Sequence, residues 1–577
     1  MKAARSTVGM LLLGAVAACA GAPPPETGDP RPNILLVLTD DLGYSDTGPY
    51  GSEIRTPTLD RLAATGLLAT SFYVAPDGGP TQAMLLTGVD HHLARAAPAS
   101  PAGAVDRLDD PDPDGHLGDR VATLASLLRD AGYHTYMAGR WELGSTPGEG
   151  PATHGFERSF SLLDDVASYW TDMKVMAEGR ERARYSIDGQ PVEALPEDFY
   201  STRSYTDFVI RSITADHVDG RPFFAYLAYQ APHSPLSLPD DWLDRNAGRY
   251  DVGFQAIQQR RLTSQKRKGL VEKEVVPFPG LPTVPRWDAL SKEQKQRQAR
   301  RMELYAGLVE NLDFHLGRLL DFLDEIGARD DTLVVFLSDN GASASDRGPV
   351  GTDADMRAVL TAAFPESSFE NWGRPGSFVE VGSGWGQTSA VPFRMFKGTH
   401  AEGGIRSPLL VSGPGVRARG EVTEALLHVT DLAPTLLELA GVSYPASYQG
   451  RTLWPQEGIS LLPLWEGETG TVRAPSAWRP LLERLQGGPD PQPPDWIAFE
   501  LGGDAAIRRG HWKAVRMTPP LGTGRWQLYR LDFDPAELHD RAEARPEELA
   551  ELIALWREYA RAHGLRIRSA ETAAIEP

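Results

Sequence analysis

The sequence predicts an α/β fold in which a large, mostly parallel sheet is sandwiched by helices and followed by a small C-terminal α+β domain. Continuous apolar runs over residues 33–38, 223–229 and 332–337 are typical of strands buried on both faces. Helical segments alternate with these runs, which favours a parallel sheet covered on both sides. Gly and Pro gather over residues 487–491, which indicates a domain boundary. With 577 residues the chain can bury an ample core in both parts.

A well-marked helix is predicted after the first strand, residues 33–38. Thr56 is expected to cap its N-terminus, Pro57 takes the first helical position and Gly66 terminates it. Pro80 predicts the start of a second helix. The loop at that helix start would lie at a positive helix end, where an anion is stabilised.

The alternation continues through the large domain. A helix is predicted over 121–130 and a strand over 135–138, and the apolar run over 223–229 gives another strand. Residues 288–327 are expected to be helical, charged in the first half and periodically apolar in the second. The run over 332–337 is a further buried strand.

The tail of the chain is predicted to be a small α+β domain. It is expected to contain short strands and then one helix, over residues 496–501, 506–517, 526–531 and 546–563. The chain is therefore divided into a large domain over 32–486, a small domain over 490–565 and a terminal tail over 566–577.

Residues 1–19 are typical of a bacterial signal peptide that ends in a lipobox. Its apolar stretch is too short to span a bilayer, which takes about 20 residues. The stretch ends in Val16-Ala17-Ala18-Cys19, so we expect Cys19 to be lipidated and residues 20–31 to form a tether. The alternative is ordinary cleavage nearby, with Cys19 incidental.

This leader predicts secretion across the inner membrane. The protein is then expected to be held by its lipid anchor, at the outer membrane, and to face the periplasm or the cell surface. No other segment is long and apolar enough to cross a membrane, so we expect membrane contact through the anchor alone. Cys19 is the only cysteine, which excludes a disulfide in the mature fold. The net charge of −20 and the pI of 5.2 argue against a nucleic-acid partner, which requires a basic face.

Polar residues follow two of the predicted strands. Asp40 and Asp41 come after the first strand, and Asp339 and Asn340 follow the strand over 332–337. Such a pair alone is usually part of a turn or a helix cap. Together, oxygen donors at the ends of parallel strands suit a hard cation, whereas zinc would be expected to recruit His or Cys. We therefore expect a Ca²⁺ site, with Mg²⁺ as the alternative.

The segment Gly78-Gly79-Pro80-Thr81-Gln82-Ala83-Met84-Leu85-Leu86-Thr87-Gly88 resembles the active-site signature of the sulfatases, C-x-P-S/T-R-x-x-L-x-T-G. Other stretches match the family in order along the chain, at residues 56–63, 155–160, 231–233, 392–397, 402–405 and 526–529. On these motifs the chain is identified as a member of the sulfatase family, from about residue 32 to about residue 564. It is similar to the large bacterial arylsulfatases of the alkaline phosphatase superfamily.

The resemblance implies both a fold and a chemistry. In active sulfatases the motif Cys is oxidised to formylglycine, whose hydrate attacks sulfur beside a calcium ion that also binds the sulfate oxygens. Carried over to this sequence, the metal ligands are Asp40, Asp41, Asp339 and Asn340. His233 corresponds to the residue that contacts the substrate or leaving group, and Lys397 to the cation that binds sulfate.

Four positions depart from the family pattern. Gly78 stands where the nucleophilic Cys is expected, and Gln82 replaces the Arg that supports it. The family's G-K-W-H-L-G reads Gly139-Arg140-Trp141-Glu142-Leu143-Gly144, so Arg140 keeps a cation with another geometry and Glu142 replaces a His by a carboxylate. These changes raise the cost of holding sulfate. The leading hypothesis is a protein without formylglycine that does not hydrolyse sulfate esters by the usual route and binds an anionic ester or glycan.

Two alternatives remain open. A metal-dependent hydrolase of sulfate, phosphate or phosphonate esters would use Thr81 as nucleophile, or Glu142 as a general base on a metal-bound water. Thr81 is also the ordinary family residue at its position, for which structural capping is the simpler interpretation. Asp77 is a candidate further metal ligand or a turn residue. The other alternative is a structural protein of the cell envelope. For the binding protein and for the hydrolase, the expected partner is a small sulfated or phosphorylated molecule.

Two further features have default structural interpretations. His91 and His92 follow the signature and are expected to buttress its loop. A basic run is expected to form a solvated helical face, with an anion-attracting rim as the minority alternative: Arg260, Arg261, Lys266, Arg267 and Lys268.

Overall fold

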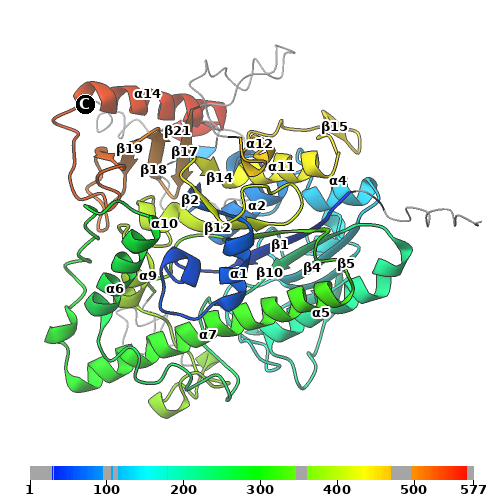
Figure 1. Cartoon of the computed structure of the whole chain (residues 1–577), viewed down its shortest axis with the longest axis horizontal. Coiled ribbons are helices and arrows are strands. Elements are labelled where there is room, and N and C mark those ends of the chain that lie inside the picture. Colours follow the sequence, from blue (N-terminus) through cyan, green and yellow to red (C-terminus); the bar gives the residue numbers. More distant parts are fainter. Residues whose placement is uncertain are drawn as a thin grey trace, which may run out of the picture.

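The computed structural model describes residues 29, 31–94, 105–107, 115–177, 180–345, 360, 362–468 and 495–567. Within these residues an 11-stranded sheet forms the centre of the molecule (Figure 1). Its strands lie in the order β13 (Glu421–Thr423), β2 (Leu67–Tyr73), β12 (Arg406–Ser412), β11 (Thr332–Ser338), β1 (Asn33–Thr39), β10 (Phe223–Ala228), β4 (His134–Arg140), β5 (Arg158–Leu162), β8 (Tyr185–Ile187) and β9 (Gln190–Val192). β14 (Leu427–His428) pairs with β2. The consecutive strands from β11 to β5 are mutually parallel, which confirms the predicted fold class.

Helices cover both faces of this sheet, and β1 shows why. Its residues are buried on both sides, and they alternate between two hydrophobic cores. Leu35 and Val37 pack into the core beneath α1 (Pro57–Thr65), α5 (Ser201–Asp216) and α7 (Lys292–Glu325). Ile34 and Leu36 pack into the core beneath α2 (Gly78–Thr87), α4 (Leu124–Asp130) and α11 (Leu432–Leu439). The two helical layers lie on opposite sides of the sheet in Figure 1.

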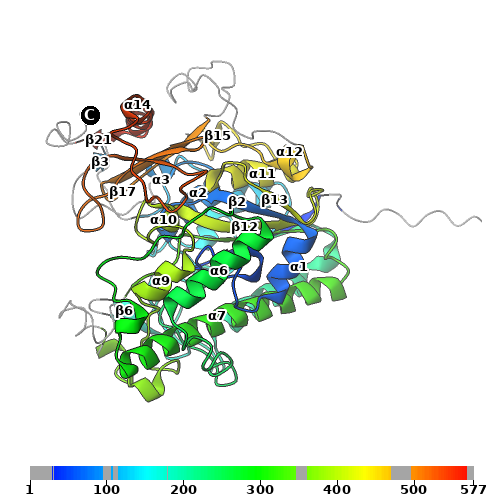
Figure 2. The same ribbon diagram turned by 60° about the vertical axis from the view of Figure 1, so that its left-hand side comes forward.

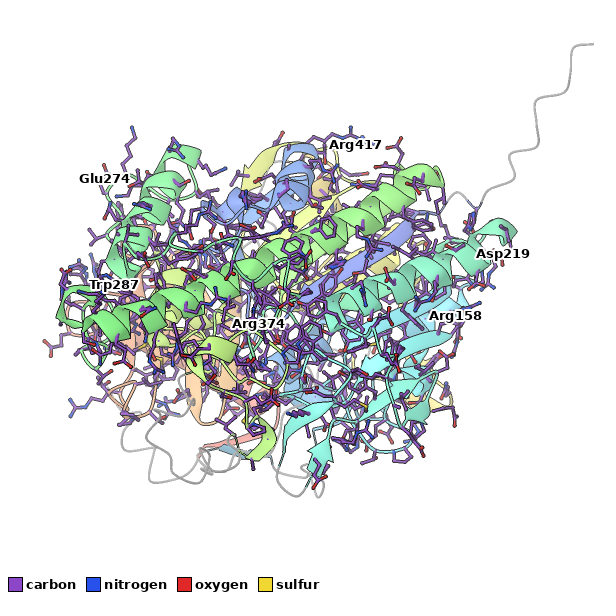
Figure 3. The ribbon with its side chains drawn as sticks, turned by 90° about the horizontal axis from the view of Figure 1, so that it is seen from below. Arg158, Asp219, Glu274, Trp287, Arg374 and Arg417 are labelled. Carbon is purple, nitrogen blue, oxygen red and sulfur yellow. The ribbon has the colours of Figure 1, made fainter. Side chains whose placement is uncertain are left out.

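Figure 3 shows the α7 face, with this 34-residue helix running across the sheet. Ser291 and Gln294 form a capping box at its start. Trp287, just before the helix, packs edge-to-face on Phe254 of α6 (Phe254–Lys268), with ring centroids 5.0 Å apart. Arg158 and Asp219 lie toward the other end of the view. The long helix therefore links the α6 side of the molecule to the α5 side.

The C-terminal domain is a four-stranded antiparallel sheet with one covering helix. Its strands lie in the order β17 (Trp496–Leu501), β18 (Asp504–Arg509), β19 (Trp512–Arg516) and β20 (Gln527–Arg530), and α14 (Pro546–Ala562) packs on them. The domain lies on the same side of the large sheet as α2 and α11 (Figures 1 and 2). Its Phe499 and Val515 share a core with Tyr73 and Ile405 of the large domain. β21 (Leu565–Ile567), which extends into the predicted tail, pairs with β3 (Val105–Arg107).

The remaining elements are short. The helices are α3 (His91–Ala94), α9 (Ser383–Ser389), α10 (Glu402–Ile405) and α12 (Leu462–Trp465), and the strands are β6 (Lys174–Ala177), β7 (Arg180–Arg182), β15 (Ser447–Tyr448) and β16 (Arg451–Thr452). Single 3-10 turns lie at Gly48–Tyr50, Pro151–His154, His217–Asp219, Trp287–Ala289, Phe369–Asn371 and Val429–Asp431.

Several element boundaries differ from those predicted. α1 has the predicted Thr56 and Gly66 as its flanking residues, but the Thr56 hydroxyl does not cap the helix and accepts a hydrogen bond from the Gly48 backbone amide at 2.8 Å instead. α2 begins at Gly78, two residues before Pro80, because Asp77 already has the extended conformation of an N-cap. α4 begins only at Leu124, since the Thr123 side chain accepts a hydrogen bond from the backbone of Ser126 and caps the helix there. The strand predicted over 506–517 is a hairpin of β18 and β19.

The basic run does not form a uniformly solvated face. Arg261 is fully buried on the inner side of α6, where it pairs with Asp46 and, at 2.9 Å, with Glu53. A buried guanidinium requires such carboxylate partners. The prediction was wrong for Arg261, because both of its partners are more than 200 residues away in the sequence.

Within the described residues, no helix has the length and apolar character needed to span a bilayer. The predicted signal peptide, Cys19 and most of the tether over 20–31 lie outside the described residues.

Candidate functional site

The predicted site residues gather at the carboxyl edge of the parallel strands. β1 lies between β10 and β11, and the register aligns Thr39 with Ser338, so Asp40 and Asp339 follow directly from neighbouring strand ends. Arg140 ends β4, on the other side of β10. Ligands bind at this edge in α/β sheets because loops from several strands converge there. The predicted ligands Asp40, Asp41, Asp339 and Asn340 are all buried, none more than 3% exposed.

Hydrogen bonds connect three of these residues, Asp41, Asp339 and Asn340. The Asp41 backbone amide donates to Asp339 Oδ1 at 3.1 Å, and the Asn340 amide donates to Asp41 Oδ1 at 2.9 Å. Asp41 has a φ of 67°, in the left-handed region that non-glycine residues rarely occupy. Such a backbone conformation at a strand end is typical of functional sites, where surrounding contacts impose it.

Lys397 and His233 approach the same carboxylates. Lys397 Nζ donates to Asp41 Oδ1 at 2.7 Å and lies 4.0 Å from Asp40 Oδ1. Its loop is fixed by backbone hydrogen bonds from Lys397 to Ala342 and from Gly398 to Pro76. His233 Nε2 lies 3.7 Å from Asp41 Oδ2, and its Nδ1 lies 2.6 Å from the Ser234 carbonyl. The predicted substrate-contacting residues therefore converge with the predicted ligands.

Arg140 joins three carboxylates from different parts of the chain. It pairs with Asp40, with Asp165, and at 3.1 Å with Glu142 Oε2. Asp165 was missed from the sequence, although it lies three residues beyond the end of β5. The signal was the acidic pair Asp164-Asp165 after Leu162-Leu163, a much shorter apolar stretch than the run that precedes Asp40 and Asp41.

The site is rich in carboxylates, and this shifts their protonation. Burial alone would raise the pKa of Asp41, but Lys397 and His233 lower it to about 2. Burial and the neighbouring Asp40 carboxylate raise the pKa of Asp339. Burial, with Asp40 and Asp77, raises the pKa of Glu142 to about 8 against the opposing effect of Arg140. A cation among these groups would relieve their mutual repulsion.

The donor set fits a hard divalent cation. Asp40 Oδ1 and Asn340 Oδ1 are buried and accept no hydrogen bond. A buried acceptor without a partner is costly unless something positive satisfies it. Asp40, Asp41 and His233 each offer a ligand atom, and these atoms lie within 4.8 Å of one another. Asp77, the candidate additional ligand, is the N-cap residue of α2 and does not cap it with its side chain.

Gly78, Gln82 and Glu142 form a compact unit at the start of α2. An ideal Cβ placed on Gly78 would lie 2.5 Å from Glu142 Oε1 and 2.7 Å from Asp339 Oδ2. The Gln82 amide donates to Glu142 Oε1 at 3.0 Å and accepts from the Glu142 backbone amide at 3.2 Å. The Glu142 carboxylate thus fills the space beside the α-carbon of residue 78.

Comparison with known proteins identifies the family. The Sulfatase family model matches residues 32–442. The chain belongs to the sulfatase family. It is 35% identical over 547 residues to an uncharacterized sulfatase from Schizosaccharomyces pombe, covering 92% of this chain and 93% of the relative. It is 34% identical over 466 residues to the arylsulfatase of Klebsiella aerogenes, covering 80% of this chain and 96% of that enzyme.

A solved structure supports the sulfatase fold. The crystal structure of Ps i-CgsB in complex with k-i-k-neocarrahexaose aligns with a TM-score of 0.62 over 94% of this chain and 96% of that chain. The sequence identity is 22%, so the likeness concerns the fold.

Within this sulfatase fold, Thr81 has a structural contact. Its hydroxyl accepts a hydrogen bond from the Ala75 backbone amide at 3.0 Å, and its side chain is fully buried. This contact fixes the chain that enters α2. It favours a structural role over a nucleophilic one, although Thr81 holds the preceding chain and does not cap α2, whose N-cap residue is Asp77.

His91 and His92 lie beyond the other end of α2, at the boundary with the C-terminal domain. Both are buried, and His92 Nε2 lies 3.2 Å from Glu500 Oε2 at the end of β17. They therefore connect the end of the sulfatase signature segment to the small domain, in keeping with a buttressing role.

Proposed function

We propose that this protein is a non-hydrolytic member of the sulfatase family that binds a divalent cation and, through it, an anionic ester or glycan. The cation, Ca²⁺ or alternatively Mg²⁺, would be held by Asp40, Asp41, Asp339 and Asn340. The observation that supports this most strongly is the position of the Glu142 carboxylate, which fills the space beside Gly78.

Sulfatase chemistry needs a nucleophile on residue 78, and glycine offers none. Glu142 also takes the room that such a side chain would need, since its oxygens lie 2.5 and 2.8 Å from an ideal Cβ. Gln82 holds Glu142 in this position by two hydrogen bonds. The loss of the nucleophile is therefore matched by the surrounding residues, which supports a binding function.

Anion binding in this pocket depends on the cation. Arg140 and Lys397 face a larger set of carboxylates: Asp40, Asp41, Asp77, Asp339, Glu142 and Asp165. In a buried site this excess of negative charge repels a sulfate or phosphate group. When bound, a divalent cation supplies positive charge and an attachment point for ester oxygens. Lys397 and His233 would then orient the ester group from the side of Asp41.

The test is cation binding and turnover measured on the same protein. Isothermal titration with CaCl₂ should show binding to the wild type that is lost in Asp40→Asn, while Asp321→Asn, an exposed carboxylate on α7, binds normally. No turnover of 4-nitrophenyl sulfate above buffer is expected with Ca²⁺ present. Turnover that disappears in Asp40→Asn would contradict the proposal, as would the absence of cation binding, which would leave a structural envelope role.

Binding of the anionic partner is tested by the same titration. Sulfated or phosphorylated oligosaccharides should bind in the presence of Ca²⁺ and not in the presence of a chelator. Binding that is equally strong with the chelator would contradict a cation-dependent site.

A second candidate is direct hydrolysis of a phosphate, phosphonate or sulfate ester, with Glu142 as the group that takes the proton from water. It is favoured by the pKa of Glu142, which burial and nearby carboxylates raise to about 8, near working pH. This function predicts turnover of an aryl phosphate or phosphodiester that is lost in Glu142→Gln. Loss in Thr81→Ala but not in Thr81→Ser would instead indicate a nucleophilic hydroxyl.

We further propose that the protein is a periplasmic or cell-surface lipoprotein anchored at the outer membrane through Cys19. The sequence Val16-Ala17-Ala18-Cys19 supports this. Labelling with a fatty-acid analogue should be lost in Cys19→Ala, and the variant should appear in the soluble fraction. Equal labelling of the variant would contradict the anchor.

A further inference from the structure

We infer that Glu142 is a ligand of the divalent cation, in the place left by the missing side chain of Gly78, and that Gln82 positions it. This inference rests on the cation site proposed above and assigns it a carboxylate that the family pattern does not contain.

The first argument is convergence. Glu142 Oε1 lies 2.5 Å, and Asp339 Oδ2 2.7 Å, from the point where a Cβ on Gly78 would stand. Two oxygens that close to one point are at most about 5 Å apart, the span across a Ca²⁺ ion with ligands at about 2.3–2.6 Å. Glu142 and the predicted ligand Asp339 therefore face the same small space.

The second argument is the unsatisfied acceptors in the same pocket. Asp40 Oδ1 and Asn340 Oδ1 are buried without a hydrogen-bond donor, in side chains 3% and 0% exposed. Asp40 and Glu142 are also bound by the same guanidinium, that of Arg140. The shared guanidinium keeps the Asp40 and Glu142 carboxylates in the same pocket, so Glu142 can add to a shell begun by Asp40 and Asp339.

The third argument concerns residue 82. The Gln82 side chain donates to Glu142 Oε1 at 3.0 Å and accepts from the Glu142 backbone amide at 3.2 Å. Arg, the family residue, has five donors and no acceptor, so it could not accept the second hydrogen bond. Its charge, added to that of Arg140, would also compete with a metal cation for the carboxylate. A neutral amide orients Glu142 without adding a second positive charge beside it, as residues around metal ligands commonly do.

The resulting donor set contains only oxygen: four carboxylates and one amide, from Asp40, Asp41, Asp339, Glu142 and Asn340. Ca²⁺ affinity rises with the number of charged ligands, and Ca²⁺ accepts more protein ligands than Mg²⁺, which retains waters. The added carboxylate should therefore raise affinity and select Ca²⁺.

The experiment counts water molecules on the ion. Tb³⁺ replaces Ca²⁺, and its luminescence lifetimes in H₂O and D₂O give the number of coordinated waters. In Glu142→Ala this number should rise by about one or more, and Ca²⁺ affinity measured by calorimetry should fall about tenfold or more. Gln82→Ala should move both readouts in the same direction by a smaller amount. Circular dichroism and thermal unfolding establish that each variant is folded.

The matched control is Asp321→Asn. Asp321 lies on α7, is 63% exposed and pairs at 3.5 Å with Arg61, so this variant removes an equal charge away from the site. Its water count should equal that of the wild type. Glu142→Gln keeps the shape and tests the charge if Glu142→Ala does not fold. An unchanged water count and affinity in the Glu142 variants would overturn the inference while leaving the cation site intact; no binding to the wild type would overturn the proposed function as well.

Discussion

A side chain on residue 78 could be accommodated only if the carboxylate of Glu142 moved. An ideal Cβ on Gly78 lies 2.5 Å from Glu142 Oε1 and 2.8 Å from Oε2, well inside van der Waals contact. The glycine in the signature segment and the glutamate that follows β4 therefore lie against one another, although 64 residues separate them.

Substitutions at these two positions should consequently be non-additive. Gly78→Ala alone should displace Glu142 and weaken Ca²⁺ binding about tenfold, because the new methyl group occupies the place of the carboxylate oxygens. In a Glu142→Ala background the same change should have a much smaller effect, giving a coupling of about 1 kcal/mol or more. A double-mutant cycle on calorimetric Ca²⁺ affinities measures this. Additive effects, within about 0.3 kcal/mol, would show that the two residues do not compete for space.

Restoring sulfatase activity should require the whole unit to be replaced. Gly78→Cys alone should remain inactive after coexpression with the enzyme that oxidises the motif cysteine, because Glu142 blocks the new side chain. The triple variant Gly78→Cys, Gln82→Arg, Glu142→His should gain turnover of 4-nitrophenyl sulfate. Mass spectrometry of the residue-78 peptide establishes whether oxidation took place. Activity of the oxidised single variant equal to that of the triple variant would contradict the steric role of Glu142.

The ends of the central strands could be predicted from the sequence because they depend on residues that are close together in the chain. Apolar runs followed by acidic pairs placed Asp40 and Asp339 at one sheet edge, and their strands are indeed adjacent and parallel. The same holds for α1, which begins at Pro57 and ends next to Gly66, as predicted.

Relationships across the sheet could not be predicted in this way. The sequence identifies Glu142 as a departure, but only the packing of β4 beside β10 and α2 brings its carboxylate to Gly78 and Gln82. Likewise a basic run suggests a solvated face, and Arg261 is buried because Asp46 and Glu53 from distant loops meet it there. Asp165 was overlooked because its strand, β5, is too short and too polar to be recognised.

The contact between the two domains contains a buried ionic network, which predicts a large effect of Lys513→Met. Lys513 Nζ lies 2.8 Å from Glu402 Oε1 and 3.0 Å from Glu537 Oε1, and all three side chains are at most 1% exposed. Replacing Lys513 by Met leaves the buried Glu402 and Glu537 carboxylates without the ammonium group, which should lower the free energy of unfolding by about 3–5 kcal/mol. Urea unfolding followed by tryptophan fluorescence measures the loss.

Glu293→Gln is the control for that prediction. Glu293 pairs with Arg297 on the surface of α7 and is 75% exposed, so its replacement should change stability by about 0.5 kcal/mol or less. A loss in Lys513→Met no larger than in this control would mean that the network does not stabilise the domain contact.

His563, at the end of α14, should make stability fall in mild alkali. Its Nδ1 lies 2.7 Å from the Tyr559 carbonyl and its Nε2 lies 2.9 Å from Glu457 Oε1, so both ring nitrogens face acceptors, which favours the imidazolium form. Burial opposes the charge, but Glu457 and Asp90 raise the pKa of His563 to about 9. Between pH 6.5 and 9 the folded state therefore holds a proton that the unfolded state lacks, so the stabilisation present below 6.5 is lost as pH rises through 9.

The free energy of unfolding should fall by about 3 kcal/mol at most over this pH range, given the size of the shift in the pKa of His563. Unfolding midpoints in urea at pH 6, 7.5 and 9 measure it, and His563→Gln should flatten the wild-type dependence in this range. His539→Gln is the matched control, because His539 is 67% exposed and pairs only at 3.5 Å with Asp534. It should retain the wild-type slope. A pH dependence of stability that persists unchanged in His563→Gln would show that another group titrates in this range. The neighbouring His91 would not be that group, because burial lowers its pKa to about 4.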